Sequence, residues 1–198
     1  MAKTMRSRER WLHEGLEILA ESGIGGVTID SLSARLGLSK GSFYHHFDGM
    51  PGYRQALLDY FEERETQDFI TRANAAPEPA GESRLRHMVA DVMAAEGGRP
   101  HLENAVRSWA SNDSVAREYL GRIDRARVDF VKEQFESMNL EEQVAADFAT
   151  IANLLAIGAA HTTPPLRPAE IVRLWDRLLS AVTSQVSPGT AAGDPATS

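Results

Sequence analysis

The stretch that decides the fold is residues 28–47, T-I-D-S-L-S-A-R-L-G-L-S-K-G-S-F-Y-H-H-F. Thr28 stands where the N-cap of a helix belongs, because its hydroxyl can accept a hydrogen bond from an amide of the first turn. Gly37 ends that helix, since glycine adopts the left-handed C-cap conformation at least cost. Ser39 begins a second helix that runs to Phe47. Two short helices joined by a tight glycine turn are typical of a helix-turn-helix DNA reader.

Each of the two helices has one apolar face. In the first helix the face follows the i, i+3, i+4, i+7 spacing of a buried stripe, at Ile29, Leu32, Ser33 and Leu36. In the second helix Phe43 and Phe47 share a face, which directs the small and polar residues outward toward bases and phosphates. The predicted DNA contacts are Thr28, Ser39, Lys40, Gly41, Ser42, Tyr44 and His45.

These residue types suit that role, although each has a plainer interpretation as a solvated helix residue. Lys40 lies near the positive end of its helix, where it can reach a guanine edge or a phosphate. Gly41 lets the backbone approach the groove closely, and the Tyr44 phenol can donate to a phosphate. His45 donates more strongly when it is protonated. Ser42 fits solvent and DNA equally well.

The segment resembles the DNA-binding domain of TetR-type transcriptional regulators. The shared features are a helix that starts at Thr, a turn that contains Gly, and a short helix that ends Tyr-x-x-Phe, here residues 44–47. The likeness extends upstream through A-E-S-G-I at residues 20–24 and is more specific than a bare helix-turn-helix pattern. It implies a helical second domain that binds a small-molecule effector and pairs two copies of the chain.

One position departs from the family pattern, at the start of the next helix. The family commonly carries a lysine there, whereas this chain reads Gly49-Met50-Pro51. The change removes a potential phosphate contact, and Asp30 and Asp48 add negative charge near the expected DNA face. The alternative function is therefore a dimeric helical ligand-binding or interaction protein with weakened DNA binding.

The composition is that of an ordinary globular protein, with 198 residues, 42% of them hydrophobic and 25% charged. The net charge is −7, but residues 1–50 hold six bases and six acids, so the remainder carries the whole excess. The chain has no cysteine, which excludes disulfides and thiolate metal sites. No apolar run reaches the roughly 18 residues of a membrane span. With no signal-peptide pattern either, we expect a cytoplasmic protein.

Apolar periodicity predicts an all-α protein of about nine helices. The first spans 6–22, two lie in the opening stretch, and the others follow at 51–74, 83–96, 101–111, 113–138, 141–160 and 168–186. We expect a DNA-binding domain at 1–50, an effector-binding and dimerisation domain at 51–186, and a disordered tail at 187–198. The bases before the first apolar stripe are either a solvated helix start or an arm along DNA.

The last two predicted helices are apolar over about half of their surface or more, which is wider than one core needs. A two-fold dimer through them is the favoured interpretation, and a fully buried internal hairpin is the alternative. The predicted interface residues are Phe148, Ile151, Leu155, Leu174, Trp175, Leu178 and Val182.

Residues 83–138 are the expected place for an effector pocket, because ligand sites form between the helices of bundles. The candidate ligand-binding residues are His87, Met88, Met93, His101, Arg107, Trp109 and Tyr119. Each methionine and aromatic also fits an ordinary core position.

No pattern in the chain predicts an enzyme. His45 and His46 are adjacent, so they face different directions on a helix and cannot share a metal as histidines at i and i+4 can. There is no glycine-rich phosphate loop or nucleophile elbow, and we expect neither metal nor cofactor. The favoured function is a ligand-responsive regulator, in most such proteins a repressor, that binds a near-palindromic operator as a dimer. Activation is the open alternative.

Overall fold

The computed structural model describes residues 7–94 and 100–186. All regular elements within these ranges are helical, which confirms the all-α prediction. The α-helices are α1 (Ser7–Ser22), α2 (Ile29–Leu36), α3 (Lys40–His46), α4 (Gly49–Glu62), α5 (Asp68–Ala75), α6 (Glu82–Ala94), α7 (Pro100–Asn112), α8 (Ser114–Glu136), α9 (Glu142–His161) and α10 (Pro168–Val186). The predicted tail lies outside the described residues, and so do Lys3 and Arg6, two of the bases before the first apolar stripe.

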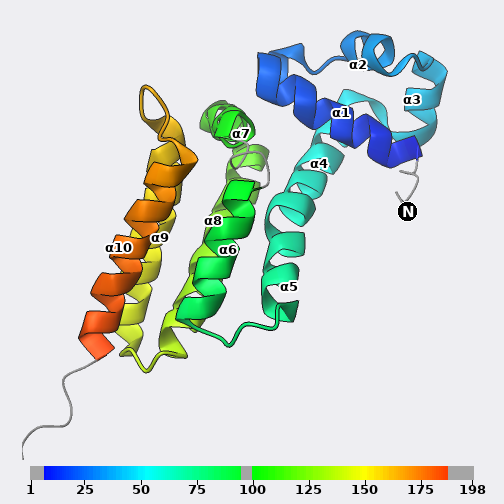
Figure 1. The fold of residues 1–198 in the computed structure, drawn as a ribbon. Coiled ribbons are helices and arrows are strands. Elements are labelled where there is room, and N and C mark those ends of the chain that lie inside the picture. Colours follow the sequence, from blue (N-terminus) through cyan, green and yellow to red (C-terminus); the bar gives the residue numbers. More distant parts are fainter. Residues whose placement is uncertain (1–6, 95–99, 187–198) are drawn as a thin grey trace, which may run out of the picture.

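Helices α1 to α3 form a small bundle at one end of the molecule (Figure 1). The local signals operate as predicted. The Thr28 hydroxyl accepts from the Ser31 amide at 3.1 Å, and the Ser31 hydroxyl accepts from the Thr28 amide at 3.0 Å. Gly37 has φ 65° and ends α2 in the left-handed conformation. Ser39 accepts from the Ser42 amide at 3.3 Å and caps α3.

The bundle has an aromatic core. Trp11 and Phe43 meet edge to face at 5.5 Å, and Tyr53 from α4 packs against Phe43 at 5.3 Å. The Tyr53 hydroxyl donates to the Trp11 carbonyl at 2.8 Å. This core continues into α7 and α8 through Val106, Trp109 and Ile123 among others. The small bundle of α1 to α3 is thus packed firmly on the rest of the described residues.

Helices α4 and α5 form one rod, as the prediction of a helix over 51–74 requires, but the rod has a π-helical turn at Glu63–Gln67. The rod runs from the small bundle down the side of α6 and α8 (Figure 1). Thr66 lies within the π-helical turn and is only 1% exposed. When the rod is taken as one helix, the described residues hold nine, the number expected.

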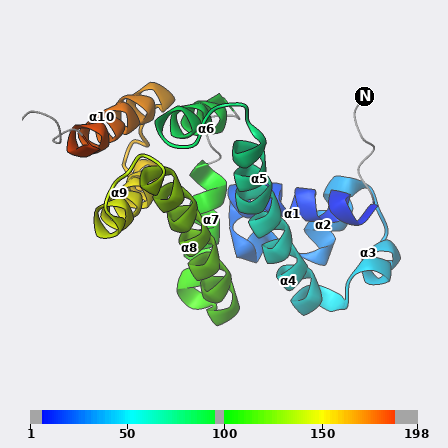
Figure 2. The ribbon, with the colours of Figure 1, turned by 90° about the horizontal axis from the view of Figure 1, so that it is seen from below.

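A second core lies among α6, α8, α9 and α10, around Phe130, Phe135, Trp175 and Leu179. Small residues let α9 pack closely on α8, because Ala145, Ala149 and Ala152 are fully buried. The other side of α9 exposes Ile151 (48%) and Leu154 (60%). Helices α9 and α10 stand at the edge of the molecule farthest from α3 (Figures 1 and 2).

By length and composition alone, α9 is apolar enough to cross a membrane, contrary to the expectation that no such segment exists. Only 22% of its apolar window is buried inside the subunit. The criterion is weak for a single helix that packs against α8 and α10, and an apolar face also serves to bind another protein.

Candidate nucleic-acid interface and cavity

Helix α3 lies at the periphery of the small bundle (Figure 2). Its residues Lys40, Gly41, Tyr44 and His45 are exposed. Tyr44 is 60% exposed, and its ring meets the buried Phe43 ring edge to face at 5.6 Å. The aromatic contact fixes the base of the Tyr44 side chain while leaving the phenol free to contact a partner molecule.

Lys40 forms an ion pair with Asp30 of α2, a contact that the sequence analysis did not anticipate. The hydrogen bond that Lys40 donates to Asp30 raises the pKa of Lys40, so the lysine remains charged at neutral pH. Both side chains are largely exposed. A phosphate that approaches Lys40 must therefore compete with Asp30, in a solvent-screened setting where such pairs are weak.

Gly41 has no steric need to be glycine within the chain. A Cβ at this position meets only the Ser39 hydroxyl, at an ordinary 3.7 Å. Any demand for a small residue here comes from something that binds the surface from outside. Ser42 is half-buried beside it, and the Thr28 and Ser39 hydroxyls already serve as caps.

His46 and Met50 behave as packing residues. The His46 Nε2 atom lies 3.1 Å from the Ser7 hydroxyl, and the ring is half-buried. Met50 is also half-buried and packs on the aromatic core. The position where the family commonly has a lysine thus contributes apolar contact here.

A cavity of about 640 Å³ lies between α4–α5, α6, α7, α8, α9 and α10. Of the seven candidate ligand residues, His87, Met88 and Met93 line it. The larger apolar residues of its wall come from helices on all sides: Phe61, Phe69, Phe130, Ile171 and Trp175.

The other four candidates do not line this cavity. Trp109 and Tyr119 belong to the first core, where Trp109 donates to Asp113 at 3.1 Å and Tyr119 donates to Asp59 at 2.5 Å. His101 is exposed. The amphipathic pattern identified their buried faces correctly but could not say which neighbour each face meets.

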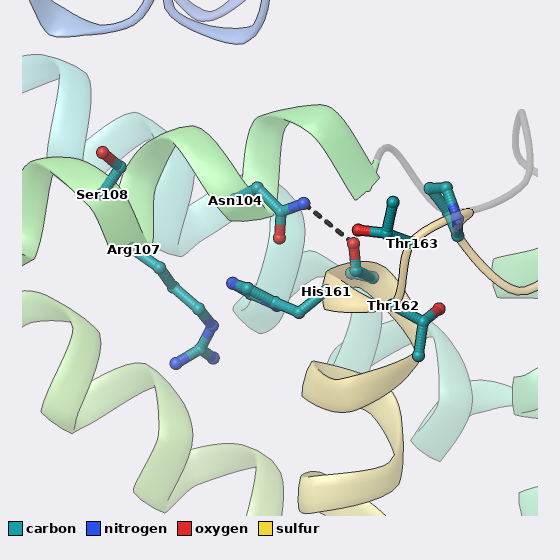
Figure 3. Close-up of a pocket in the computed structure, with 8 residues that line it drawn as sticks. Asn104, Arg107, Ser108, His161, Thr162 and Thr163 are labelled. Atoms are coloured by element: carbon teal, nitrogen blue, oxygen red, sulfur yellow. Dashed lines mark hydrogen bonds between the residues drawn. The ribbon is translucent and has the colours of Figure 1, made fainter.

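Arg107 lines a second, more open hollow of about 540 Å³ together with Asn104 and His161 (Figure 3). Asn104 donates to the Ala160 carbonyl at 2.9 Å and ties α7 to the end of α9. Ala160 and Pro165 line both hollows, so the two spaces adjoin at the α9–α10 turn.

An ion network separates the hollows. Glu103 contacts Arg107 at 2.7 Å and Arg127 at 3.1 Å, and Arg107 also donates to Asp124 at 2.7 Å. Burial raises the pKa of Glu103, but the two guanidinium groups together lower it by more than burial raises it. Its pKa therefore lies below the usual glutamate value. Glu103 is therefore ionised at neutral pH.

Polar contacts also fasten α4 to α8 between the small bundle and the cavity. Arg122 donates to Glu62 at 2.5 Å and lies over the Tyr119 ring at 4.1 Å. One turn earlier on α4, Asp59 accepts from Tyr119, and this bond raises the pKa of Tyr119. These contacts connect α4, which packs on the small bundle, to α8, which lines the cavity.

The candidate interface residues divide into two groups. Ile151 is exposed, and Phe148, Leu155, Leu174 and Leu178 are half-buried. Trp175 and Val182 are 6% and 0% exposed and pack inside the subunit, so we leave them out of the interface proposed below. Leu154 belongs with the exposed group, and the sequence analysis did not include it.

Comparisons with known proteins match the small bundle to a family model and most of the chain to solved structures. Residues 12–52 match the family model described as bacterial regulatory proteins, tetR family. A curated relative from Pseudomonas putida, the uncharacterized HTH-type transcriptional regulator TtgW, is 30% identical over 57 residues. That stretch covers 29% of this chain and 42% of the relative, so the chain spans about two fifths of that protein's length.

Solved structures share the fold across most of the chain. A transcriptional regulator from Rhodococcus sp. Rha1 has a TM-score of 0.73 at 16% identity, covering 91% of this chain and 97% of its own. SCO4454, a TetR-family regulator from Streptomyces coelicolor, has a TM-score of 0.74 at 20% sequence identity, and the match covers 94% of this chain and 92% of SCO4454. The multidrug binding protein EbrR, complexed with malachite green, has a TM-score of 0.64 at 14% sequence identity, and the match covers 88% of this chain and 98% of EbrR.

Proposed function

We propose that this chain, whose residues 12–52 form a helix-turn-helix domain of the tetR family, is a dimeric transcriptional regulator that binds DNA and releases it when an effector enters the cavity. Proteins of this family are DNA-binding regulators rather than enzymes, and we assign no catalytic role. We assign DNA reading to residues 1–50 and effector binding and pairing to residues 51–186, in the cytoplasm.

The exposed face of α3 carries the proposal for DNA binding. It presents a charged lysine, a phenol, an imidazole and a glycine around one short helix that is capped at Ser39 and anchored by Phe43. Such groups position a protein on phosphates and reach base edges in a major groove. In a two-fold dimer, two copies of α3 would enter grooves about 34–36 Å apart.

The cavity supports the effector role. Its volume of about 640 Å³ is within the usual range for small-molecule sites, and its wall is mostly apolar but also holds three arginines and four carboxylates. The structural neighbour EbrR is complexed with malachite green, which shows that this fold can hold a small organic molecule. An effector changes DNA affinity only by its differential affinity for the two states of the protein.

The apolar face of α9 supports pairing of two copies. Ile151 and Leu154 are exposed there, beside the half-buried Phe148 and Leu155. A contiguous apolar surface of this kind marks an interface in a soluble protein. Because α9 and α10 stand far from α3, pairing through them leaves both reading heads clear (Figure 1).

A mobility-shift assay tests the regulator directly. The DNA that flanks the protein's own coding region is compared with a shuffled sequence of equal length at several salt concentrations. We expect a shift that is specific for the flanking DNA and that weakens as salt rises, because phosphate contacts release counterions. Sequence-blind or absent binding at every salt concentration favours the second candidate, a dimeric ligand-binding protein without DNA function, to which the Lys40–Asp30 pair and Met50 point.

A further inference from the structure

The polar groups of the 640 Å³ cavity differ in how deeply they lie. The bases Arg64, Arg72 and His87 and the acids Asp68 and Asp91 are solvent-exposed, and Glu65 is half-buried. The Arg127 and Glu103 side chains are only 26% and 19% exposed. The less exposed part of the wall therefore offers a ligand one guanidinium, that of Arg127, and two carboxylates, those of Glu65 and Glu103, in a mostly apolar space. A charged group of the ligand must engage one of these three side chains, because an unpaired charge is costly in such a space.

Arg127 is more loosely held than Glu103. Its contacts with both Glu103 oxygens and with the Thr66 hydroxyl all lie between 3.1 and 3.3 Å. Charge-assisted bonds of this kind are commonly about 2.7–2.9 Å. Glu103, in contrast, has a 2.7 Å contact with Arg107, which Asp124 holds in turn.

The two kinds of charged ligand therefore face different obstacles. A cation that reaches Glu103 must compete with two arginines. An anion that reaches Arg127 competes with one carboxylate through long contacts, and Glu103 keeps Arg107 as its partner afterwards. Only in the second case do Glu103, Arg107 and Arg127 each keep a partner of opposite charge.

We infer that the effector is an organic acid: an apolar body filling the cavity and one carboxylate held by the Arg127 guanidinium. This inference rests on the proposed role of the cavity as the effector site. The guanidinium fork matches a carboxylate in two parallel hydrogen bonds. The body lies against the aromatic wall formed by Phe61, Phe130 and Trp175.

A ligand carboxylate bound to Arg127 can also affect helices α1 to α3, because Arg127 contacts the α4–α5 rod. Arg127 donates to Thr66, which lies in the π-helical turn of the α4–α5 rod, and such turns frequently occur at functional sites. Glu65 of the same turn lines the cavity. A carboxylate that draws Arg127 away from Thr66 removes a side-chain hydrogen bond from this turn, and the rod carries α1 to α3 at its other end. Acid binding is thus expected to lower DNA affinity.

Three probes of one shape test the inference: 4-phenylbutanoate, 4-phenylbutanamide and 4-phenylbutylammonium, titrated into the full chain by calorimetry. We expect the acid to bind at least about tenfold more tightly than the amide, as a hydrogen-bonded charge pair predicts, and the ammonium probe to bind most weakly. Arg127→Gln should abolish the preference for the acid over the amide. Arg125→Gln, an exposed arginine on the same helix, should retain it.

Arg127→Lys keeps the charge without the fork and should show a reduced preference, so it carries the test if the glutamine variant does not fold. The inference is overturned by tighter binding of the ammonium probe, by no binding of the acid at millimolar concentration, or by an Arg127 variant with unchanged preference. Operator binding is measured on the same preparation. A protein that binds DNA but no acid refutes this inference alone, and one that binds acid but no DNA refutes the regulator.

Discussion

At the scale of single residues, the reading surface depends on side chains with different attachments to the protein. The Tyr44 phenol is exposed on a ring that Phe43 supports, whereas the Lys40 ammonium group is paired with Asp30 in the free protein. In the proposed complex with DNA, the phenol is free to bind, and the lysine would exchange the Asp30 carboxylate for a phosphate. Neither side chain carries much of the fold.

Tyr44→Phe and Lys40→Ala should each weaken operator binding, with a change in unfolding free energy within about 0.5 kcal/mol, as for other exposed positions. Loss of the Lys40 charge from a phosphate should also reduce the salt slope of binding by about one, whereas loss of the neutral Tyr44 hydroxyl should leave the slope unchanged. Fluorescence anisotropy with labelled operator measures affinity, and thermal melts measure stability. Glu118→Gln, on the exposed side of α8, is the control. Unchanged affinity in both variants would remove them from the interface.

Gly15 is the residue of α1 that can least tolerate a side chain. A Cβ there lies 1.9 Å from the Tyr53 hydroxyl oxygen, which donates to the Trp11 carbonyl. We expect Gly15→Ala to lower stability by about 1–3 kcal/mol through overpacking. Gly25→Ala, whose Cβ meets nothing within 4 Å, should have little effect. Denaturant titration compares the two, and equal stability would show that the α1–α4 contact is looser than described.

The stability of the folded protein should depend on pH through Glu103. Its folded-state pKa is lowered, so its ionised form stabilises the protein above its ordinary pKa of about 4.3, and this stabilisation is lost as pH falls through the lower folded value. The stability gap between the wild type and Glu103→Gln should therefore narrow between pH 7 and pH 3. Urea titrations at both values measure the gap. A gap that is constant or wider at low pH would contradict the ionised network.

At the scale of elements, local signals determined what could be predicted. The bounds of α2 and α3 follow from Thr28, Gly37 and Ser39, each of which acts within four residues of itself. The π-helical turn at Glu63–Gln67 was not predicted, and its buried Thr66 bonds to Arg127, a residue 61 positions away. Trp109 and Tyr119 were correctly expected to be buried, but they pack under the reading head, because periodicity identifies a face and not its neighbour.

Helix α9 should carry the pairing of subunits. Leu154→Glu places a charge on a side chain that is 60% exposed in the subunit, so it should disrupt a dimer without unfolding the chain. Leu178 is half-buried against the second core, so a charge there would disturb both the core and the dimer. Sedimentation at low micromolar concentration should show a dimer for the wild type and a monomer for the variant. Gln143→Glu, also exposed on α9, is the control, and a variant that stays dimeric counts against this face.

At the scale of the whole molecule, two cores are joined by one rod. The first core holds α1 to α4 against α7 and α8, and the second surrounds the cavity. The α4–α5 rod crosses between them and is fastened to α8 by Tyr119, Arg122 and Arg127. In the proposed dimer, a change at the cavity would therefore alter the spacing of the two helix-turn-helix domains, which is the quantity that an operator with fixed half-sites detects.

The most direct measurement is an operator selection from random double-stranded DNA with the full chain, followed by the stoichiometry of the selected complex. We predict a near-palindromic sequence whose half-sites are centred about one helical turn apart, or a multiple of that, bound by an even number of chains. The Leu154→Glu variant should bind the same sequence far more weakly. Selection of no sequence, or of a single half-site bound by one chain, would contradict the account of a paired DNA-reading regulator.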